Sequence, residues 1–162
     1  KKPSLTAISA SKSPQGLTLD NFFPYQLTQL QAVISDCIAD IYMGKFDLTR
    51  HEWRVLAILG SGIEMSAKQI GLLSNLEKMQ ASRAISKMLA EKLVVKTTDI
   101  NDKRSALLKL TPRGLSVYQQ LVPMALAREE QLLSVLDQDE KQLLTKMMNK
   151  LSLQSQSILS NE

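Results

Sequence analysis

The sequence has little of the chemistry that catalytic, metal-binding and cross-linked proteins need. Its 162 residues include one cysteine, Cys37, and one histidine, His51. One cysteine cannot form an internal disulfide, and one histidine without a cluster of cysteines or carboxylates cannot hold a metal ion. No nucleophile with an adjacent base and no glycine-rich phosphate loop is apparent. We therefore predict that the protein is not an enzyme and has neither a metal site nor a cofactor.

Long apolar runs are missing as well. No stretch approaches the roughly 20 consecutive apolar residues of a membrane-spanning helix, and none combines a short apolar core with a signal-peptide cleavage site. With 162 residues, the chain can bury a core without disulfides or metal ions. We expect a soluble cytoplasmic protein of one domain, with or without an elaborated dimer interface, that does not bind membranes.

Positive charge is concentrated in one part of the chain. The net charge is only +4, but residues 61–114 hold ten Lys or Arg and five Asp or Glu, whereas the remaining residues hold ten and eleven. A local excess of positive charge attracts polyanions and supplies the nonspecific part of an affinity for nucleic acid. The alternative is a solvated basic surface without a partner.

The first third of the sequence predicts an arm followed by a long helix. Residues 1–16 are rich in Lys, Ser and Pro and show no periodicity, which is typical of a mobile arm. From Phe22 to Met43, apolar residues recur at intervals of three and four, as in a helix packed against other helices. These residues are Leu27, Leu30, Ile34, Cys37 and Ile41.

A helix-turn-helix is predicted in the middle of the chain. Thr49 and Glu52 have the spacing of a capping box, which indicates that a helix begins there. Ser66 is placed to cap a short helix over 67–73, and a turn separates that helix from a basic one over 77–91. Two short helices joined by a tight turn form this motif.

The basic helix has an apolar side and a polar side. The residues expected to pack inward are Ala81, Ala84, Ile85 and Met88. The residues expected to project from the opposite side are Gln80, Arg83, Ser86 and Lys87. Arginine can bridge two acceptors of guanine, glutamine can pair with adenine, and lysine and serine can contact phosphates. The alternative is a solvated amphipathic helix without a ligand.

A β-hairpin with a charged tip is predicted after the basic helix. Residues 93–95 are β-prone, and a second apolar run over 106–110 lies beyond a tip at 99–104. The two basic residues of the tip could enter a narrow minor groove. Its two acidic residues could orient them or simply form the turn. The four residues are Lys103, Arg104, Asp99 and Asp102.

The last third of the sequence is predicted to be helical. Thr111 is a cap and Pro112 suits the first turn of a helix, which Pro123 is expected to bend or interrupt. An acidic segment at 137–140 opens a second helix. The apolar residues that keep helical spacing are Leu115, Tyr118, Val122, Ala125, Leu143, Leu144, Met147 and Leu151.

Several short motifs occur together along the chain. They are Leu48-Thr49-x-x-Glu52-Trp53, Ser82-Arg83 in a helix, Asp99-x-x-Asp102-x-Arg104, and Leu110-Thr111-x-x-Gly114. In this order they resemble the MarR family of bacterial transcription regulators, over about residues 22–158. The chain departs from the family pattern at two positions. Leu93 stands where many members have glycine after the recognition helix, and Lys96 stands where arginine is usual.

The resemblance implies a mainly α-helical fold with a small β-hairpin wing. It implies a winged helix-turn-helix DNA-binding lobe over 48–111 and a helical dimerisation region formed by 17–47 and 112–162. The implied function is that of a ligand-responsive repressor that binds a pseudo-palindrome in double-stranded DNA as a homodimer. The alternative is a helical protein–protein adaptor without specific DNA binding. The residues expected to contact DNA are Ser66, Lys68, Gln69, Lys78, Gln80, Ser82, Arg83, Ser86, Lys87, Asp102, Lys103 and Arg104.

The resemblance also implies an effector, often a small aromatic or phenolic acid, held between the dimer helices and the DNA-binding lobe. We hypothesise that Arg54 contacts it with His51 or Trp53, and that Tyr25 contributes. The alternatives are that Trp53 belongs to the core and that Arg54 is a surface or ion-paired residue. Cys37 lies late in the first helix on its apolar seam, so redox sensing is not expected.

Overall fold

The computed structural model describes residues 16–98 and 106–160, which form six α-helices, one short 3-10 helix and three strands. The elements are η1 Leu19–Asn21, α1 Phe23–Gly44, α2 Arg50–Leu59, β1 Met65–Ser66, α3 Ala67–Ser74, α4 Lys78–Ala90, β2 Val94–Thr98, β3 Ala106–Leu110, α5 Pro112–Leu133 and α6 Gln138–Ser160. The predicted fold class, mainly α with a small wing, is confirmed.

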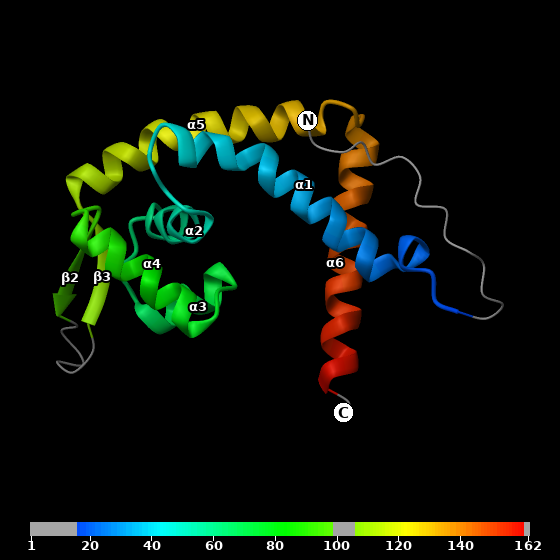
Figure 1. Cartoon of the computed structure of the whole chain (residues 1–162), viewed down its shortest axis with the longest axis horizontal. Coiled ribbons are helices and arrows are strands. Elements are labelled where there is room, and N and C mark those ends of the chain that lie inside the picture. The colour runs from blue at the N-terminus through cyan, green and yellow to red at the C-terminus, as the bar shows by residue number, and fades with distance from the viewer. Residues whose placement is uncertain (1–15, 99–105, 161–162) are drawn as a thin grey trace.

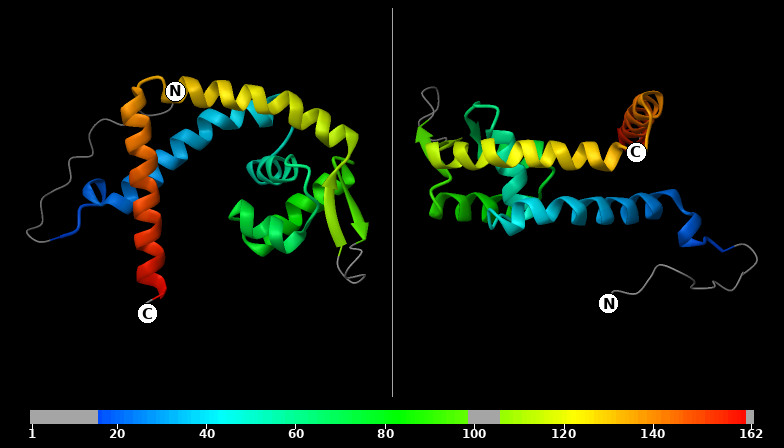
Figure 2. Two further views of the ribbon diagram at one scale, coloured as in Figure 1. Left: turned by 180° about the vertical axis from the view of Figure 1, so that it is seen from behind. Right: turned by 90° about the horizontal axis from the view of Figure 1, so that it is seen from above.

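The elements divide between a lobe and a set of long helices (Figure 1). We call α2, α3, α4 and the sheet the winged lobe. Helices α1 and α5 run side by side away from it, and α6 follows the far end of α5 at a steep angle to that helix (Figure 2). Arg128 of α5 donates a hydrogen bond to the carbonyl oxygen of Cys37 in α1 at 2.6 Å, which ties the two long helices together.

The starts of several helices follow from side-chain caps. In α2, the amide of Thr49 donates to Glu52 Oε2 at 2.9 Å, and the amide of Glu52 donates to Thr49 Oγ1 at 3.3 Å. Ser66 and Gln69 make the same reciprocal pair at the start of α3. Each pair satisfies two amides that the first turn leaves without helical partners. The predicted helix starts at Thr49 and Ser66 are confirmed.

The turn between α3 and α4 depends on one residue in the left-handed conformation. Asn75 has φ 51° and ψ 46°, which asparagine tolerates better than most residues. The amide of Leu76 reaches back to the carbonyl oxygen of Gly71 at 3.1 Å and closes the end of α3. The predicted helix-turn-helix is therefore present, with Asn75 at its corner.

The predicted hairpin is present, but it belongs to a larger sheet. Strands β2 and β3 pair antiparallel from Val94 opposite Leu110 to Thr98 opposite Ala106. The sequence analysis missed β1, whose residue Met65 pairs with Leu108 on the other edge of β3. The sheet order is β1-β3-β2, so the wing is fixed to the loop before α3.

The core lies inside the winged lobe. The four residues of the basic helix that were predicted to pack inward, Ala81, Ala84, Ile85 and Met88, are all buried. They pack with α2, β3 and the middle of α5, through residues such as Leu56, Leu108 and Leu121. Because the buried side of α4 is fixed by this core, its opposite side must face solvent.

Within a single chain, the long helices leave exposed much of the apolar surface that was predicted to pack against other helices. Of the predicted seam of α1, Ile41 is buried, but Leu27, Leu30 and Cys37 are exposed. Helix α6 buries none of its residues. Helix α5 continues through Pro123, so this proline does not interrupt it. The described residues of the single chain therefore leave broad apolar surfaces uncovered on their long helices.

Helix α4 ends in a left-handed turn at Lys92. The amide of Lys92 donates to Leu89 O at 3.1 Å and that of Leu93 to Met88 O at 2.9 Å, the two bonds of a Schellman motif. Lys92 occupies its left-handed position with φ 58°. The sequence analysis placed the position of the family's usual glycine at Leu93. In the structure, the residue with positive φ is Lys92, one position earlier.

Replacing Lys92 with glycine is expected to raise the free energy of unfolding by about 1 kcal/mol, because glycine adopts this conformation without a Cβ clash. Urea denaturation followed by circular dichroism measures the change. Lys45 is the matched control, since it follows α1 with φ −87° and gains nothing from glycine. An equal gain in both variants, or none in Lys92→Gly, would contradict the explanation.

Candidate nucleic-acid interface

One face of α4 is free of contacts with the core. Residues Met79, Ser82, Arg83 and Ser86 are all exposed, and their spacing of three, four and seven places them on one side of the helix. Among the described residues, Arg83 takes part in no salt bridge. The prediction that Arg83 and Ser86 project outward is confirmed. Met79, which is 62% exposed, was not among the predicted contacts.

Two predicted members of this face have partners on other sides of the helix. Gln80 is half-buried, and its side-chain oxygen accepts the amide of Glu77 at 3.2 Å as part of a cap. Lys87 turns toward α2, so the prediction that both side chains project with Arg83 is wrong. Both residues lie about 100° around the helix from the middle of the exposed face.

Lys87 holds α4 against α2. Its ammonium nitrogen lies 3.1 Å from Glu52 Oε2, 3.6 Å from Glu91 Oε1 and 3.2 Å from the carbonyl oxygen of Asp47. The Glu52 side chain is only 5% exposed. The hydrogen bond to Glu52, with the nearby charges of Glu52, Glu91 and Asp47, raises the pKa of Lys87. With its ammonium bound to these acceptors, Lys87 stabilises the packing of α4 against α2.

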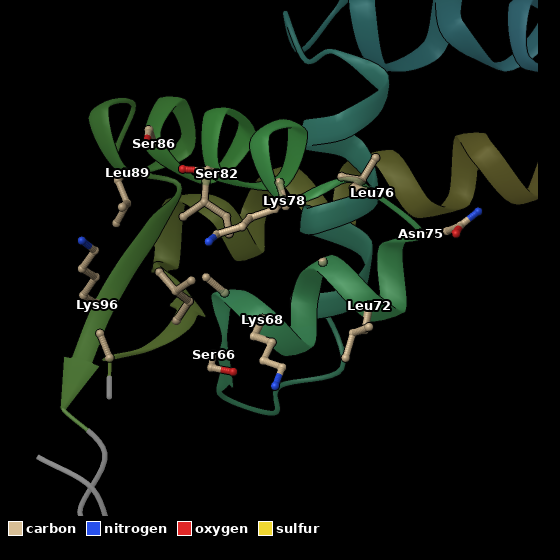
Figure 3. Close-up of a pocket in the computed structure, with 16 residues that line it drawn as sticks. Ser66, Lys68, Leu72, Asn75, Leu76, Lys78, Ser82, Ser86, Leu89 and Lys96 are labelled. Carbon is tan, nitrogen blue, oxygen red and sulfur yellow. The ribbon is translucent and has the colours of Figure 1, made fainter. Parts of the chain in front are cut away.

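A groove runs between α3, α4 and the sheet (Figure 3). Lys78 extends into it from α4 and Lys96 lies at its edge on β2, whereas Lys68 lines it from α3 with its ammonium directed away from α4, as the figure shows. Leu76, Ala81, Ile85, Leu89 and Leu108 supply its apolar surface. Five of the predicted DNA contacts therefore line one groove. They are Ser66, Lys68, Lys78, Ser82 and Ser86.

Lys96 was not predicted as a contact, although it completes the ring of lysines around the groove. Its side chain is exposed on β2, opposite Leu108 in the register of the sheet. The sequence could have indicated it, because Lys96 is a charged residue within a β-prone run that begins at Val94. Gln69, which was predicted, does not line the groove and instead caps α3.

The base of the wing is tied to the lobe by Glu64. Lys109 of β3 donates to Glu64 Oε1 at 2.8 Å, and the hydroxyl of Thr97 in β2 donates to Oε2 at 2.5 Å. The hydrogen bonds from Lys109 and then from Thr97 lower the pKa of Glu64 below its ordinary value. The predicted wing contacts Asp102, Lys103 and Arg104 lie outside the described residues.

Replacing Glu64 with glutamine is expected to destabilise the protein at neutral pH but not in acid. A carboxyl whose pKa is lowered by folding stabilises the native state above its unfolded pKa, about 4.3, and this contribution is lost as the pH falls through the lower folded pKa. The urea midpoints of wild type and Glu64→Gln should therefore differ at pH 7 and converge in acid. Glu130→Gln on the exposed side of α5 is the control, and a difference that persists in acid would contradict this account.

Three of the residues predicted to hold an effector lie in α2, and the fourth, Tyr25, lies near the start of α1. The guanidinium of Arg54 donates to the carbonyl oxygen of Ser74 at 3.2 Å, and Arg54 does not line the groove. Trp53 stacks on Tyr42 with ring centroids 6.3 Å apart and packs against the core. Tyr25 accepts a hydrogen bond from Gln29 near the start of α1, and His51 is half-buried in the first turn of α2. Their contact with an effector stays a prediction.

Two other possibilities find no support in the described parts of the chain. No group of three or more His, Cys, Asp or Glu residues there is arranged to hold a metal ion. Among the helices that the structure describes, none combines the length and the apolar character needed to cross a membrane.

Known proteins match both the lobe and the whole arrangement. A family model described as "MarR family" matches residues 46–105. The chain is 22% identical over 112 residues to the HTH-type transcriptional regulator MhqR of Bacillus subtilis (strain 168), a match that covers 69% of this chain and 77% of MhqR.

Solved structures extend the likeness to the long helices. The MarR/EmrR family transcriptional regulator from Acinetobacter sp. ADP1 superposes with a TM-score of 0.78 and 26% identity, covering 87% of this chain and 99% of that one. BpsR of Bordetella bronchiseptica, whose DNA binding is regulated by 6-hydroxynicotinic acid, superposes with a TM-score of 0.76 and 19% identity, covering 85% and 97%.

Proposed function

We propose that the chain is a transcription regulator of the MarR family, whose model matches residues 46–105, and that it acts as a ligand-responsive repressor that binds a pseudo-palindromic operator as a homodimer. The observation that carries the proposal is the exposed face of α4, where Arg83 lies between two serines beside a groove ringed by lysines. A recognition helix needs a long donor for base edges and short neighbours that let the helix approach the groove floor.

Different residues on and around α4 contact the bases and the phosphates of duplex DNA. Arg83 reads guanine through its two acceptors, because its guanidinium has no partner among the described acidic groups. Lys68, Lys78 and Lys96 neutralise phosphates beside the helix. The hydroxyls of Ser82 and Ser86 donate to phosphate oxygens, whereas the hydroxyl of Ser66 donates to Gln69 Oε1 at 2.8 Å within the α3 cap. Contact of Lys103, Arg104 and Asp102 with the minor groove stays a prediction from the sequence, because these residues lie outside the described part of the chain.

Dimerisation is supported by the apolar surfaces of the long helices. Exposed patches of this extent on a single chain mark an interaction surface. A second copy that covers them would place two α4 helices about one turn of DNA, roughly 34 Å, apart. The exposed apolar residues are Leu27, Leu30 and Val33 of α1, Met124 and Leu126 of α5, and Leu143, Leu144, Met147, Met148 and Leu151 of α6.

A small aromatic acid is the proposed effector class. The regulation of BpsR by 6-hydroxynicotinic acid supports this class. Such a ligand acts only if it binds one arrangement of the two lobes more tightly than the other. We propose that it binds between the dimer helices and the winged lobe and releases the operator by changing the distance between the recognition helices.

The test begins with selection of bound sequences from a random duplex library, followed by fluorescence anisotropy at several salt concentrations. We expect a pseudo-palindrome whose affinity falls steeply with salt. Arg83→Ala should weaken operator binding by about 1–3 kcal/mol. Arg113→Ala is the matched control, because it removes the same charge from an exposed position outside the groove. Failure of Arg83→Ala to weaken binding, or a folded dimer that selects no motif, would contradict the proposal.

A further inference from the structure

The exposed face of α4 carries an apolar side chain, Met79, which forms no favourable contact with a phosphate or with the polar edge of a base. Six side chains of α4 are exposed, and three of them are long: Lys78, Met79 and Arg83. Lys78 extends into the lysine-ringed groove rather than along the outer face of the helix (Figure 3). Met79 and Arg83 are therefore the two long side chains on the face that would enter the major groove.

Met79 lies in the first turn of α4, one residue after Lys78, where recognition helices contact base edges. Its side chain is 62% exposed. Methionine donates no hydrogen bond and its sulfur is a weak acceptor, so base edges offer it only one favourable apolar group. In the major groove that group is the 5-methyl of thymine.

We propose that Met79 is a specificity-determining residue that reads the methyl group of one thymine in each half-site. The inference rests on the proposed function and adds a base preference to it. Residues 79 and 83 are one helical turn apart, which is a rise of about 6 Å. Base pairs are stacked about 3.4 Å apart. The thymine should therefore lie about two base-pair steps from the guanine that Arg83 reads.

The experiment removes the methyl group without changing any hydrogen bond of the base pair. In the selected operator, each thymine of one half-site is replaced in turn by deoxyuridine, and affinities are measured by anisotropy for the full-length wild type and Met79→Ala. We expect one position at which the wild type binds about fourfold more weakly, the effect of one lost methyl contact. Met79→Ala should bind the thymine operator about as weakly and show no further loss with deoxyuridine.

Two variants keep the result interpretable. Met79→Leu retains an apolar side chain and should keep the sensitivity to the methyl group. Leu73→Ala removes an equally exposed apolar side chain, 63% exposed, from α3 and outside the groove, and should leave the methyl effect at its wild-type size. Circular dichroism confirms that each variant is folded.

The outcomes separate this inference from the proposed function. If wild type and Met79→Ala bind the operator with the same response to every deoxyuridine, Met79 reads no methyl group, and the inference is overturned while the regulator assignment stands. If the folded wild type selects no duplex at all, the proposed function fails and this inference fails with it.

Discussion

Replacing Gly114 with alanine is expected to lower the free energy of unfolding by about 3 kcal/mol. A Cβ atom at this position would lie 2.0 Å from the carbonyl oxygen of Leu93, closer than two such atoms can approach. The same oxygen accepts the amide of Thr111 at 3.0 Å. Because it is a backbone atom held by that bond, it cannot move aside as the end of a flexible side chain would.

The clash would act where the long helices join the winged lobe. Thr111 caps α5 by accepting the amide of Gly114 at 3.0 Å, and its hydroxyl donates to the carbonyl oxygen of Lys92 at 2.7 Å. The first turn of α5 thus rests directly on the turn that ends α4. In Gly114→Ala this turn of α5 must shift, and the end of α4 would lose its support.

Urea denaturation of Gly114→Ala, followed by far-ultraviolet circular dichroism, measures the loss. Gly44→Ala is the matched control, because a Cβ atom there would meet nothing within 4 Å. Gly44 is the last residue of α1, so alanine should be neutral or slightly stabilising. Equal stability of Gly114→Ala and wild type would show that the contact with Leu93 is not as close as the structure has it.

The features that could be predicted from the sequence are those made by neighbours along the chain. Thr49 and Glu52 are three residues apart, and so are Thr111 and Gly114, so both caps are visible in the sequence and both are present. The buried side of α4 was predictable for the same reason, since a helical period fixes which residues share a face. Arg83 followed as a residue on the opposite face.

The features that could not be predicted depend on contacts between elements. Strand β1 has only two residues, too few for an alternating pattern, and exists because β3 offers a free edge. Lys87 looks like an exposed lysine in the helical period, but its partner Glu52 lies 35 residues away on α2. Lys96 joins Lys68 and Lys78 only after the sheet is folded against α3 and α4.

Replacing Lys87 with methionine is expected to lower the free energy of unfolding by about 2 kcal/mol, because Glu52 would stay buried with only its capping bond to Thr49. The figure is kept below that of a fully buried pair because the Lys87 side chain is 37% exposed and solvent screens it. Folding raises the pKa of Lys87, so its contribution is complete below the unfolded pKa and is lost as the pH rises through the folded one. The cost should be present at pH 7 and shrink in strong alkali.

The double variant with Glu52→Gln tests whether the ion pair is the cause. Glutamine keeps an acceptor for the amide of Thr49 but removes the buried charge that Lys87 neutralises. The double variant should therefore be more stable than the sum of the two single effects predicts. Additive effects would show that Lys87 stabilises the lobe by some other contact.

The same variant decides whether Lys87 also binds DNA. At a urea-free condition where Lys87→Met remains folded, we expect its operator affinity and salt dependence to match the wild type, because its ammonium is held by Glu52 and Asp47 on the side of α4 that faces α2. Lys78→Met should instead weaken binding to all duplexes and reduce the salt slope by about one. If Lys87→Met reduces the slope as much as Lys78→Met does, then Lys87 leaves Glu52 for a phosphate on binding, and the ion pair is a feature of the free protein alone.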